Sequence, residues 1–152
     1  MEARRDPFEV GLAALRRRER TTRELAEWLG RRGFGPEDVE AALARLAAAG
    51  ELDDERFAHR YAEDKRSLSG WGAERIREAL LARGIDGATT DAVLASESHA
   101  DQLERARGLL ARRGRPLTDN AERQRALEYL ARRGYDYEIA YEAVRQASPR
   151  AA

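Results

Sequence analysis

LGRRGF at residues 29–34, LLARGI at 80–85 and LARRGY at 130–135 are three versions of one short pattern. They align on Gly33, Gly84 and Gly134, which are separated by 51 and 50 residues. A period of this length is typical of proteins built from stacked supersecondary units. These three residues, which we name the stop glycines, therefore mark three copies of one structural unit.

Each stop glycine is flanked by residues that suit the end of a helix. A leucine stands four residues before it, an arginine directly before it and an apolar residue directly after it. The arginine complements the macrodipole in the last turn, and the glycine adopts the left-handed conformation that closes the helix. Pro36 stands where the first turn of a following helix accepts proline. The pattern predicts a helix, a glycine stop and a second helix.

A further helix is expected before each such pair, because apolar side chains recur at helical spacing over residues 7–18, 54–67 and 101–112. In the first copy, Thr21 and Glu24 form a capping-box pattern at the start of the middle helix. No segment alternates at period two, so strands are not expected. The predicted fold class is all-α, with about nine helices in three tandem three-helix repeats: residues 1–50, 51–98 and 99–148, followed by a disordered tail at 149–152.

The packing of these repeats follows from their size. A unit of about 50 residues is marginal alone, so neighbouring repeats are expected to pack into an elongated, curved, solenoid-like rod.

Two segments weaken the helical pattern. GATT at residues 87–90 predicts a last helix of the second repeat that is short or begins late, and Gly108 costs about 1 kcal/mol within its helix. Six aromatic residues are expected to pack at core-facing or cap-closing positions: Trp28, Phe34, Phe57, Tyr61, Tyr135 and Tyr141.

Charge is balanced over the whole chain but segregated along it. The sequence has 28 basic and 28 acidic residues, with net charges of +1, −4 and +3 over residues 1–50, 51–100 and 101–152. A neutral total argues against indiscriminate binding to nucleic acid. The N-terminus lacks an apolar signal core, no apolar run is long enough to span a bilayer, and cysteine is absent. These features predict a cytoplasmic protein that is neither exported nor embedded in a membrane.

The segment LDDERFAHRYAEDKR at 52–66, together with TTREL, GWGAERIREALLARGI and LARRGY in this order, resembles the RecX family of bacterial regulators of the RecA recombinase. The resemblance covers nearly the whole chain. It implies a three-repeat curved rod that binds the RecA filament on single-stranded DNA and restrains its growth, ATP turnover and strand exchange. It also implies a role in DNA repair, recombination and the SOS response, with RecA as the partner of a monomer and DNA contacted weakly or through RecA.

Two groups of charged residues are candidates for partner contact. In the second repeat, one of Asp53 and Asp54 is expected to cap the helix, and the candidates for binding a protein partner are Asp54, Arg56, Arg60, Lys65 and Arg66. The densest basic runs are candidates for the filament or nucleic acid: Arg16, Arg17, Arg18, Arg112, Arg113 and Arg115. A solvated helix face is the competing interpretation of each run. Trp71, between two glycines, is expected at a joint between repeats in preference to a partner surface.

Catalysis has little support in the sequence. His59 and His99 lie 40 positions apart and no cysteine is present, so a metal site is not expected. No glycine-rich phosphate loop and no nucleophile–base pair are recognisable, so neither a cofactor nor an enzymatic activity is expected. The alternative function is a direct DNA-binding regulator, because a three-helix unit with a glycine turn can host a helix-turn-helix. Against it, no middle helix carries a distinct run of base-reading side chains.

Overall fold

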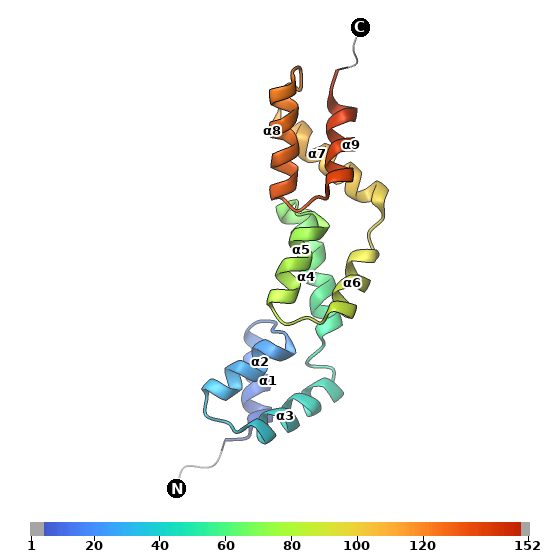
Figure 1. The fold of residues 1–152 in the computed structure, drawn as a ribbon. Helices are drawn as coiled ribbons and strands as arrows, with labels where there is room; N and C mark the ends of the chain where they lie inside the picture. Colours follow the sequence, from blue (N-terminus) through green and yellow to red (C-terminus); the bar gives the residue numbers. More distant parts are fainter. Residues whose placement is uncertain (1–4, 150–152) are drawn as a thin grey trace. The chain divides into compact units, whose positions relative to one another are not determined.

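The computed structural model of the protein describes residues 5–149 and shows helices joined by short connections (Figure 1). Within this range no strand is present, which confirms the all-α prediction. The helices between residues 5 and 149 are α1 (Pro7–Arg17), α2 (Thr22–Arg31), α3 (Pro36–Ala48), α4 (Asp54–Ser69), α5 (Ala73–Ala82), α6 (Gly87–Ala95), α7 (His99–Arg113), α8 (Asn120–Arg132) and α9 (Tyr137–Ala147).

The chain forms two compact units whose division runs through the second repeat. The first unit takes in the described residues up to Arg60 together with Leu80–Thr90. The second takes in Tyr61–Ala79 and the described residues from Asp91 onward. The helices α4, α5 and α6 therefore each contribute one end to each unit. The repeat limits at residues 50 and 98 stay predictions, and the tail at 149–152 lies almost wholly outside the described residues.

The stop glycines end their helices as predicted. Their φ angles are +92°, +94° and +98° at Gly33, Gly84 and Gly134. In each repeat the N–H after the glycine donates to the carbonyl of the predicted leucine, at 3.3, 3.1 and 3.1 Å in chain order. This is the hydrogen bond of a Schellman cap, and only a residue without a Cβ adopts its conformation without strain.

The helix starts are also set locally. Thr21 Oγ1 accepts from the N–H of Glu24 at 3.2 Å, and the Thr21 N–H donates to the Glu24 carboxylate at 3.0 Å, so the predicted capping box is present. Of the two candidate caps of α4, Asp53 accepts the N–H of Arg56 at 3.0 Å. Asp54 instead contacts the first repeat.

Helix α6 fulfils one of the two alternatives predicted for it. It is short, with 9 residues, and it does not begin late. It starts three residues after Gly84, as α3 and α9 start three residues after their own stop glycines. Asp86 caps it by accepting the N–H of Thr89 at 2.7 Å, and Thr90 is fully buried where an apolar residue was expected. Threonine is therefore tolerated as a core residue at this position.

Separate cores lie under the first and third repeats. In the first, α1 and α2 pack on α3 around Leu25, Leu29 and Leu46, and Leu52 joins this core although it lies beyond residue 50. In the third, α7 and α8 pack on α9. Its buried residues are Ala106, Leu109, Leu110, Leu117, Ala126, Leu130, Tyr135, Ile139, Ala140, Ala143 and Val144.

Within the first unit, the start of α2 is bonded to the stop of α5. Thr21 Oγ1 donates to the Arg83 carbonyl at 2.6 Å, and the Arg23 guanidinium donates to the Ala82 carbonyl. The Arg83 guanidinium in turn donates to the Glu24 carboxylate at 3.1 and 3.2 Å. We name this set of contacts the first joint. It uses the helix-capping groups of two different repeats.

The second unit contains an equivalent arrangement, which we name the second joint. The Gly72 N–H donates to the Arg133 carbonyl at 2.7 Å, and the Glu74 N–H donates to the Gly134 carbonyl at 2.9 Å. The Tyr135 hydroxyl donates to the Gly70 carbonyl at 3.0 Å. The start of α5 is thus bonded to the stop of α8, as the start of α2 is bonded to the stop of α5.

The first joint predicts a loss of stability in acid that depends on Glu24. Burial acts to raise the pKa of Glu24, but the Thr21 N–H and the Arg83 guanidinium outweigh it and hold the pKa below its ordinary value of 4.5. The folded state therefore binds fewer protons, so this contribution is complete above about pH 4.5 and is lost as the pH falls through the folded-state pKa. Glu24→Gln is expected to lower the free energy of unfolding by about 1 kcal/mol near neutral pH and by much less at about pH 3.

Urea unfolding of both proteins at the two pH values measures this difference. Glu27→Gln is the matched control, because the Glu27 carboxylate makes only an exposed pair with Arg23 at 3.8 Å on the same helix. If Glu24→Gln lowers the free energy of unfolding equally at both pH values, the role assigned to the Glu24 carboxylate is contradicted.

Candidate functional site

Three of the predicted partner-binding residues make contacts within the first unit. Asp54 accepts from the Thr22 N–H at 2.8 Å and from its hydroxyl at 3.0 Å. The Arg56 guanidinium donates to the Gly50 carbonyl at 3.1 Å, and Arg60 pairs with Glu19 at 2.6 Å. These contacts tie the start of α4 to the first repeat. They give a structural reason for the LDDERFA string that does not require a partner.

The other two residues of that group lie in the second unit. Arg66 Nε is 3.4 Å from the Glu97 carboxylate, and its side chain is only 16% exposed. Glu97 also accepts from Arg105 at 2.9 Å, so Arg66 belongs to a nearly buried ion cluster. Lys65 Nζ lies 4.7 Å from the Trp71 ring centroid. Contact of these five residues with a partner stays a prediction, and the Arg66 side chain offers little accessible surface for it.

Trp71 lies at the second joint. Its carbonyl accepts from Arg105 at 3.1 Å, and its N–H donates to the Lys65 carbonyl at 3.0 Å. The ring has the Arg75 guanidinium 4.2 Å from its centroid in addition to Lys65, and it meets Tyr61 edge to face at 6.4 Å. The backbone position agrees with the expected joint. Cations and a second aromatic ring cover part of the indole.

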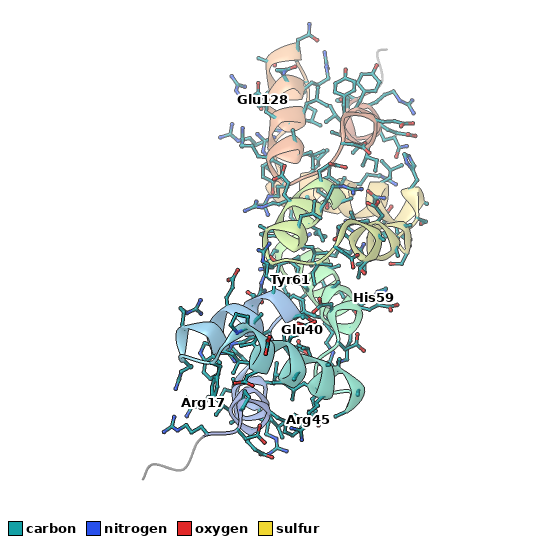
Figure 2. The ribbon with its side chains drawn as sticks, turned by 60° about the horizontal axis from the view of Figure 1, so that its bottom comes forward. Arg17, Glu40, Arg45, His59, Tyr61 and Glu128 are labelled. Carbon is teal, nitrogen blue, oxygen red and sulfur yellow. The ribbon has the colours of Figure 1, made fainter. Side chains whose placement is uncertain are left out.

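The first predicted basic run is joined by arginines from another helix. Arg17 lies in the last turn of α1 and is exposed, as are its two neighbours (Figure 2). Burial, and then the charges of Arg18, Arg17 and Arg31, lower the pKa of Arg20, and Arg20 lies over the same Trp28 ring as Arg32 at the end of α2. We name this group the basic surface of the first repeat: Arg16, Arg17, Arg18, Arg20, Arg31 and Arg32.

The acidic residues between these arginines are engaged elsewhere. Glu19, Glu24 and Glu27 pair with Arg60, Arg83 and Arg23, none of which belongs to the basic surface. Among the described residues, no carboxylate lies within salt-bridge distance of the six arginines. Their charge is therefore left to attract an anionic partner.

Trp28 holds two of these arginines in place. The Arg20 and Arg32 guanidinium carbons lie 5.2 and 4.4 Å from its ring centroid. A guanidinium stacked on an aromatic ring is pre-organised and keeps N–H groups on its edge for a carboxylate or a phosphate. Trp28 packs against the core of the first repeat, as the sequence suggested, and it is only partly buried. In the sequence, only the clustering of arginine and tryptophan at the end of α2 could have indicated this stacked arrangement.

The second predicted basic run lies at the end of α7. Arg112 is exposed, and Arg115 lies in the connection after Gly114, the left-handed residue that ends the helix. The Arg113 guanidinium lies 5.2 Å from the Tyr129 ring centroid, and Arg133 lies 4.9 Å from the same ring. The first and third repeats thus each place two arginines on one aromatic ring of their middle helix.

Tyr141 differs from its expected core position. Its side chain is 52% exposed, because the buried stripe of α9 is made by Ile139, Ala140, Ala143 and Val144.

Among residues 5–149, no group of three or more acidic, histidine or cysteine side chains could hold a metal ion. In the same range, no helix is both long enough and apolar enough to cross a bilayer.

Solved structures share this fold. A crystal structure of RecX from Lactobacillus salivarius matches with a TM-score of 0.85 and 18% identity, over 93% of this chain and 94% of that one. A crystal structure described as regulatory protein RecX matches with a TM-score of 0.78 and 23% identity, over 92% of this chain and 70% of that one. At these identities the likeness establishes the fold.

Sequence comparisons establish the family. Residues 8–46, 53–94 and 100–144 match the sequence models of the first, second and third three-helix domains of RecX. The regulatory protein RecX of Xanthomonas campestris is 39% identical over 133 residues, which are 86% of this chain and 80% of the relative. The regulatory protein RecX of Stenotrophomonas maltophilia is 37% identical over 132 residues, with the same coverage. With its three-helix repeats in the same order, the chain belongs to the RecX family of regulatory proteins.

Proposed function

We propose that this protein is a negative modulator of the RecA recombinase, which binds the RecA filament on single-stranded DNA and restrains its growth, ATP turnover and strand exchange. The observation that carries this proposal is the succession of all three RecX domains along one chain. Members of this family act on RecA. The protein acts by binding, as a monomer in the cytoplasm, and it needs no cofactor.

The basic surface of the first repeat supports this proposal physically. A filament on DNA is an extended anionic partner, and a protein of zero net charge can approach it only through a local excess of cations. The six arginines of this surface supply that excess, since their acidic neighbours are paired with other cations. Contacts of this kind favour association and orient it more than they increase raw affinity.

ATP hydrolysis by RecA on single-stranded DNA, measured at increasing concentrations of this protein, tests the proposal. Turnover is expected to fall, and the protein is expected to sediment with the filament. Arg17→Glu should raise the concentration for half-inhibition by roughly tenfold, which corresponds to about 1.4 kcal/mol of binding free energy. Unchanged turnover together with no sedimentation would exclude a role as a RecA modulator.

Arg45→Glu is the matched control. Arg45 also lies on the first repeat and is exposed, but it stands on α3 beside Asp6, at 3.9 Å (Figure 2). Arg45→Glu should leave the concentration for half-inhibition nearly unchanged. Equal effects of Arg17→Glu and Arg45→Glu would show that inhibition depends on the total charge of the protein and not on the basic surface of the first repeat. A gel shift with duplex DNA in the absence of RecA tests the alternative, a helix-turn-helix regulator, which predicts tight binding to a preferred sequence.

A further inference from the structure

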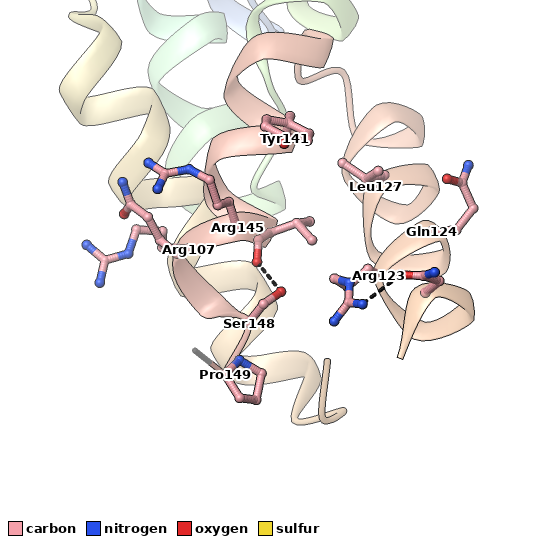
Figure 3. Close-up of a pocket in the computed structure, with 11 residues that line it drawn as sticks. Arg107, Arg123, Gln124, Leu127, Tyr141, Arg145, Ser148 and Pro149 are labelled. Carbon is pink, nitrogen blue, oxygen red and sulfur yellow. Dashed lines mark hydrogen bonds between the residues drawn. The ribbon is translucent and has the colours of Figure 1, made fainter. Parts of the chain in front are cut away.

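A groove of about 830 Å³ lies between α8 and α9 of the third repeat, within the second unit (Figure 3). Figure 3 shows Leu127 and Arg123 of α8 opposite Ser148 of α9, with Tyr141 at one end. A volume of this size accommodates a few residues of a bound peptide. The lining residues, none of which belongs to either joint, are Arg107, Asn120, Arg123, Gln124, Leu127, Tyr141, Val144, Arg145, Gln146, Ser148 and Pro149.

The charge of this groove has one sign. Among the described residues that line it, three are arginines and none carries a carboxylate. The Arg123 guanidinium donates to the Leu117 carbonyl at 3.3 Å and to Asn120 Oδ1 at 2.6 Å, so neutral groups hold it in place and leave its charge uncompensated. Arg107 and Arg145 pair with acidic residues outside the groove, at 3.2 and 3.7 Å. Such exposed pairs are weak, and a better anion can replace them.

Part of the groove wall is apolar. Leu127, Val144 and Pro149 line it beside the arginines. Val144 is a core residue of the third repeat, and Leu127 packs against that core, so this part of the wall continues the hydrophobic core to the surface. A large apolar side chain placed against it would leave water, which strengthens binding by at least about tenfold. The groove therefore combines an anion-binding part with an apolar part.

The aromatic rim presents one ring to the groove. Tyr141 is 52% exposed and lines it, whereas its neighbour Tyr137 does not. The two rings are stacked, with centroids 5.9 Å apart and an interplanar angle of 25°, so one face of Tyr141 is already occupied. Sites for single-stranded nucleic acid stack successive bases on several rings. A single remaining face suits one apolar side chain better than a row of bases.

We propose that this groove binds a short acidic segment of a second protein partner. The carboxylates of the segment bind Arg123, Arg145 and Arg107, because the planar guanidinium matches a carboxylate with two parallel hydrogen bonds. One large apolar side chain of the segment lies between Leu127 and Tyr141. The proposal goes beyond modulation of RecA, since the groove shares no residue with the basic surface of the first repeat and its binding requires neither RecA nor DNA.

Fluorescence anisotropy tests the proposal with a short fluorescein-labelled peptide of aspartates ending in phenylalanine, titrated with the protein without RecA and DNA. Saturable binding is expected. A peptide with glycine in place of the phenylalanine should bind at least about tenfold more weakly, because it lacks the apolar side chain. Arg123→Gln should weaken binding of the phenylalanine peptide by about tenfold, as expected for the loss of one charge-assisted hydrogen-bonded pair.

Tyr141→Ala tests the apolar part of the site separately. It should weaken binding of the phenylalanine peptide by about fivefold, the loss of one aromatic pair, and leave binding of the glycine peptide nearly unchanged. The two proteins and two peptides form a double-mutant cycle, which isolates the contact between the phenylalanine and Tyr141 from changes elsewhere. The exposed position of Tyr141 makes this variant safe for folding.

Arg125→Gln is the matched control, since Arg125 lies on the same helix as Arg123, pairs with Glu122 at 2.7 Å and does not line the groove. It should bind the phenylalanine peptide within about twofold of the unmodified protein. Circular dichroism of each variant confirms that the helices are intact.

Two results of the peptide titrations would overturn the proposal. One is the absence of saturable binding. The other is equal affinity for the phenylalanine and glycine peptides together with equal losses in Arg123→Gln and Arg125→Gln, which would indicate diffuse charge attraction. Displacement of the peptide by an oligodeoxythymidylate whose own binding is weakened by both Arg123→Gln and Tyr141→Ala would assign the groove to nucleic acid and would also overturn it.

The ATP-hydrolysis assay separates this groove from the proposed function. Arg123→Gln should leave the concentration for half-inhibition of RecA within about twofold of its original value, because the partner of the groove is a different protein. A loss of inhibition as large as the loss of peptide binding would assign the groove to the RecA filament and would overturn the proposal of a second partner. Since the peptide titrations contain no RecA, their failure would leave the proposed function untouched.

Discussion

Gly134→Ala is expected to lower the free energy of unfolding by about 3 to 5 kcal/mol, the sum of backbone strain and overpacking. Gly134 has φ of +98°, and a Cβ added there would lie 2.4 Å from Arg75 Cβ and 2.6 Å from the Arg75 backbone N. Backbone atoms cannot move aside as the end of a flexible side chain can. The second joint would have to open, with loss of the Glu74 N–H bond to the Gly134 carbonyl at 2.9 Å.

The first repeat provides the control for this prediction. Gly33 occupies the same place in its repeat, with φ of +92°, but no atom lies within 4 Å of an added Cβ. Gly33→Ala therefore introduces the left-handed strain without the collision and should cost only about 1 to 2 kcal/mol. Urea unfolding followed by circular dichroism measures both values. Equal losses at the two glycines would show that the close approach at the second joint contributes nothing.

Glu97→Ala is expected to lower the free energy of unfolding by about 3 to 5 kcal/mol, because it leaves two arginines without their counterion. The exposed fractions of the Glu97, Arg105 and Arg66 side chains are 10%, 14% and 16%. Burial acts to lower the pKa of Arg105, but Glu97 and Tyr135 outweigh it, and the net shift is upward. An arginine side chain stays protonated at neutral pH, so Arg105 keeps its charge when Glu97 is removed. Its hydrogen bonds to the Trp71 carbonyl and the Tyr135 hydroxyl link this ion cluster to the second joint.

Asp91→Ala is the control for the ion cluster. Asp91 pairs with Arg77 in the same unit, but the two side chains are 64% and 38% exposed. Exposed pairs of this kind contribute about 0 to 1 kcal/mol, so little loss is expected. Chemical unfolding measures the loss of unfolding free energy for Glu97→Ala and for Asp91→Ala. A loss below about 1 kcal/mol for Glu97→Ala would mean that solvent reaches the arginines and replaces the carboxylate.

Most of the fold was predictable because its determinants are local. The helix ends at Gly33, Gly84 and Gly134, the capping box of Thr21 and the proline at the start of α3 all act between residues close in the chain. A capping hydrogen bond spans three to five residues, so a short string contains both of its partners. The same locality applies at α6, where the cap at Asp86 sets the start of the helix and the apolar pattern does not.

The candidate sites were predictable only in part, because an isolated basic run does not show which of its charges are already paired. The runs at Arg16–Arg18 and Arg112–Arg115 were visible as strings of cations. The contribution of Arg31 and Arg32 to the first surface was not, since these residues also suit a helix end. Tyr141 was expected in the core, because helical spacing alone does not fix which edge of the apolar stripe faces solvent.

The sequence by itself therefore determined the helices, their ends, the three-repeat order and the family of this protein. The tertiary structure decided which charged groups are consumed within the fold and which stay available. Asp54 meets Thr22 across 32 positions, Arg105 meets the Trp71 carbonyl across 34, and Thr21 meets the Arg83 carbonyl across 62. Such partners are brought together only when separate helices pack, because the pairing of a charge depends on distance in space, whereas capping depends on distance along the chain.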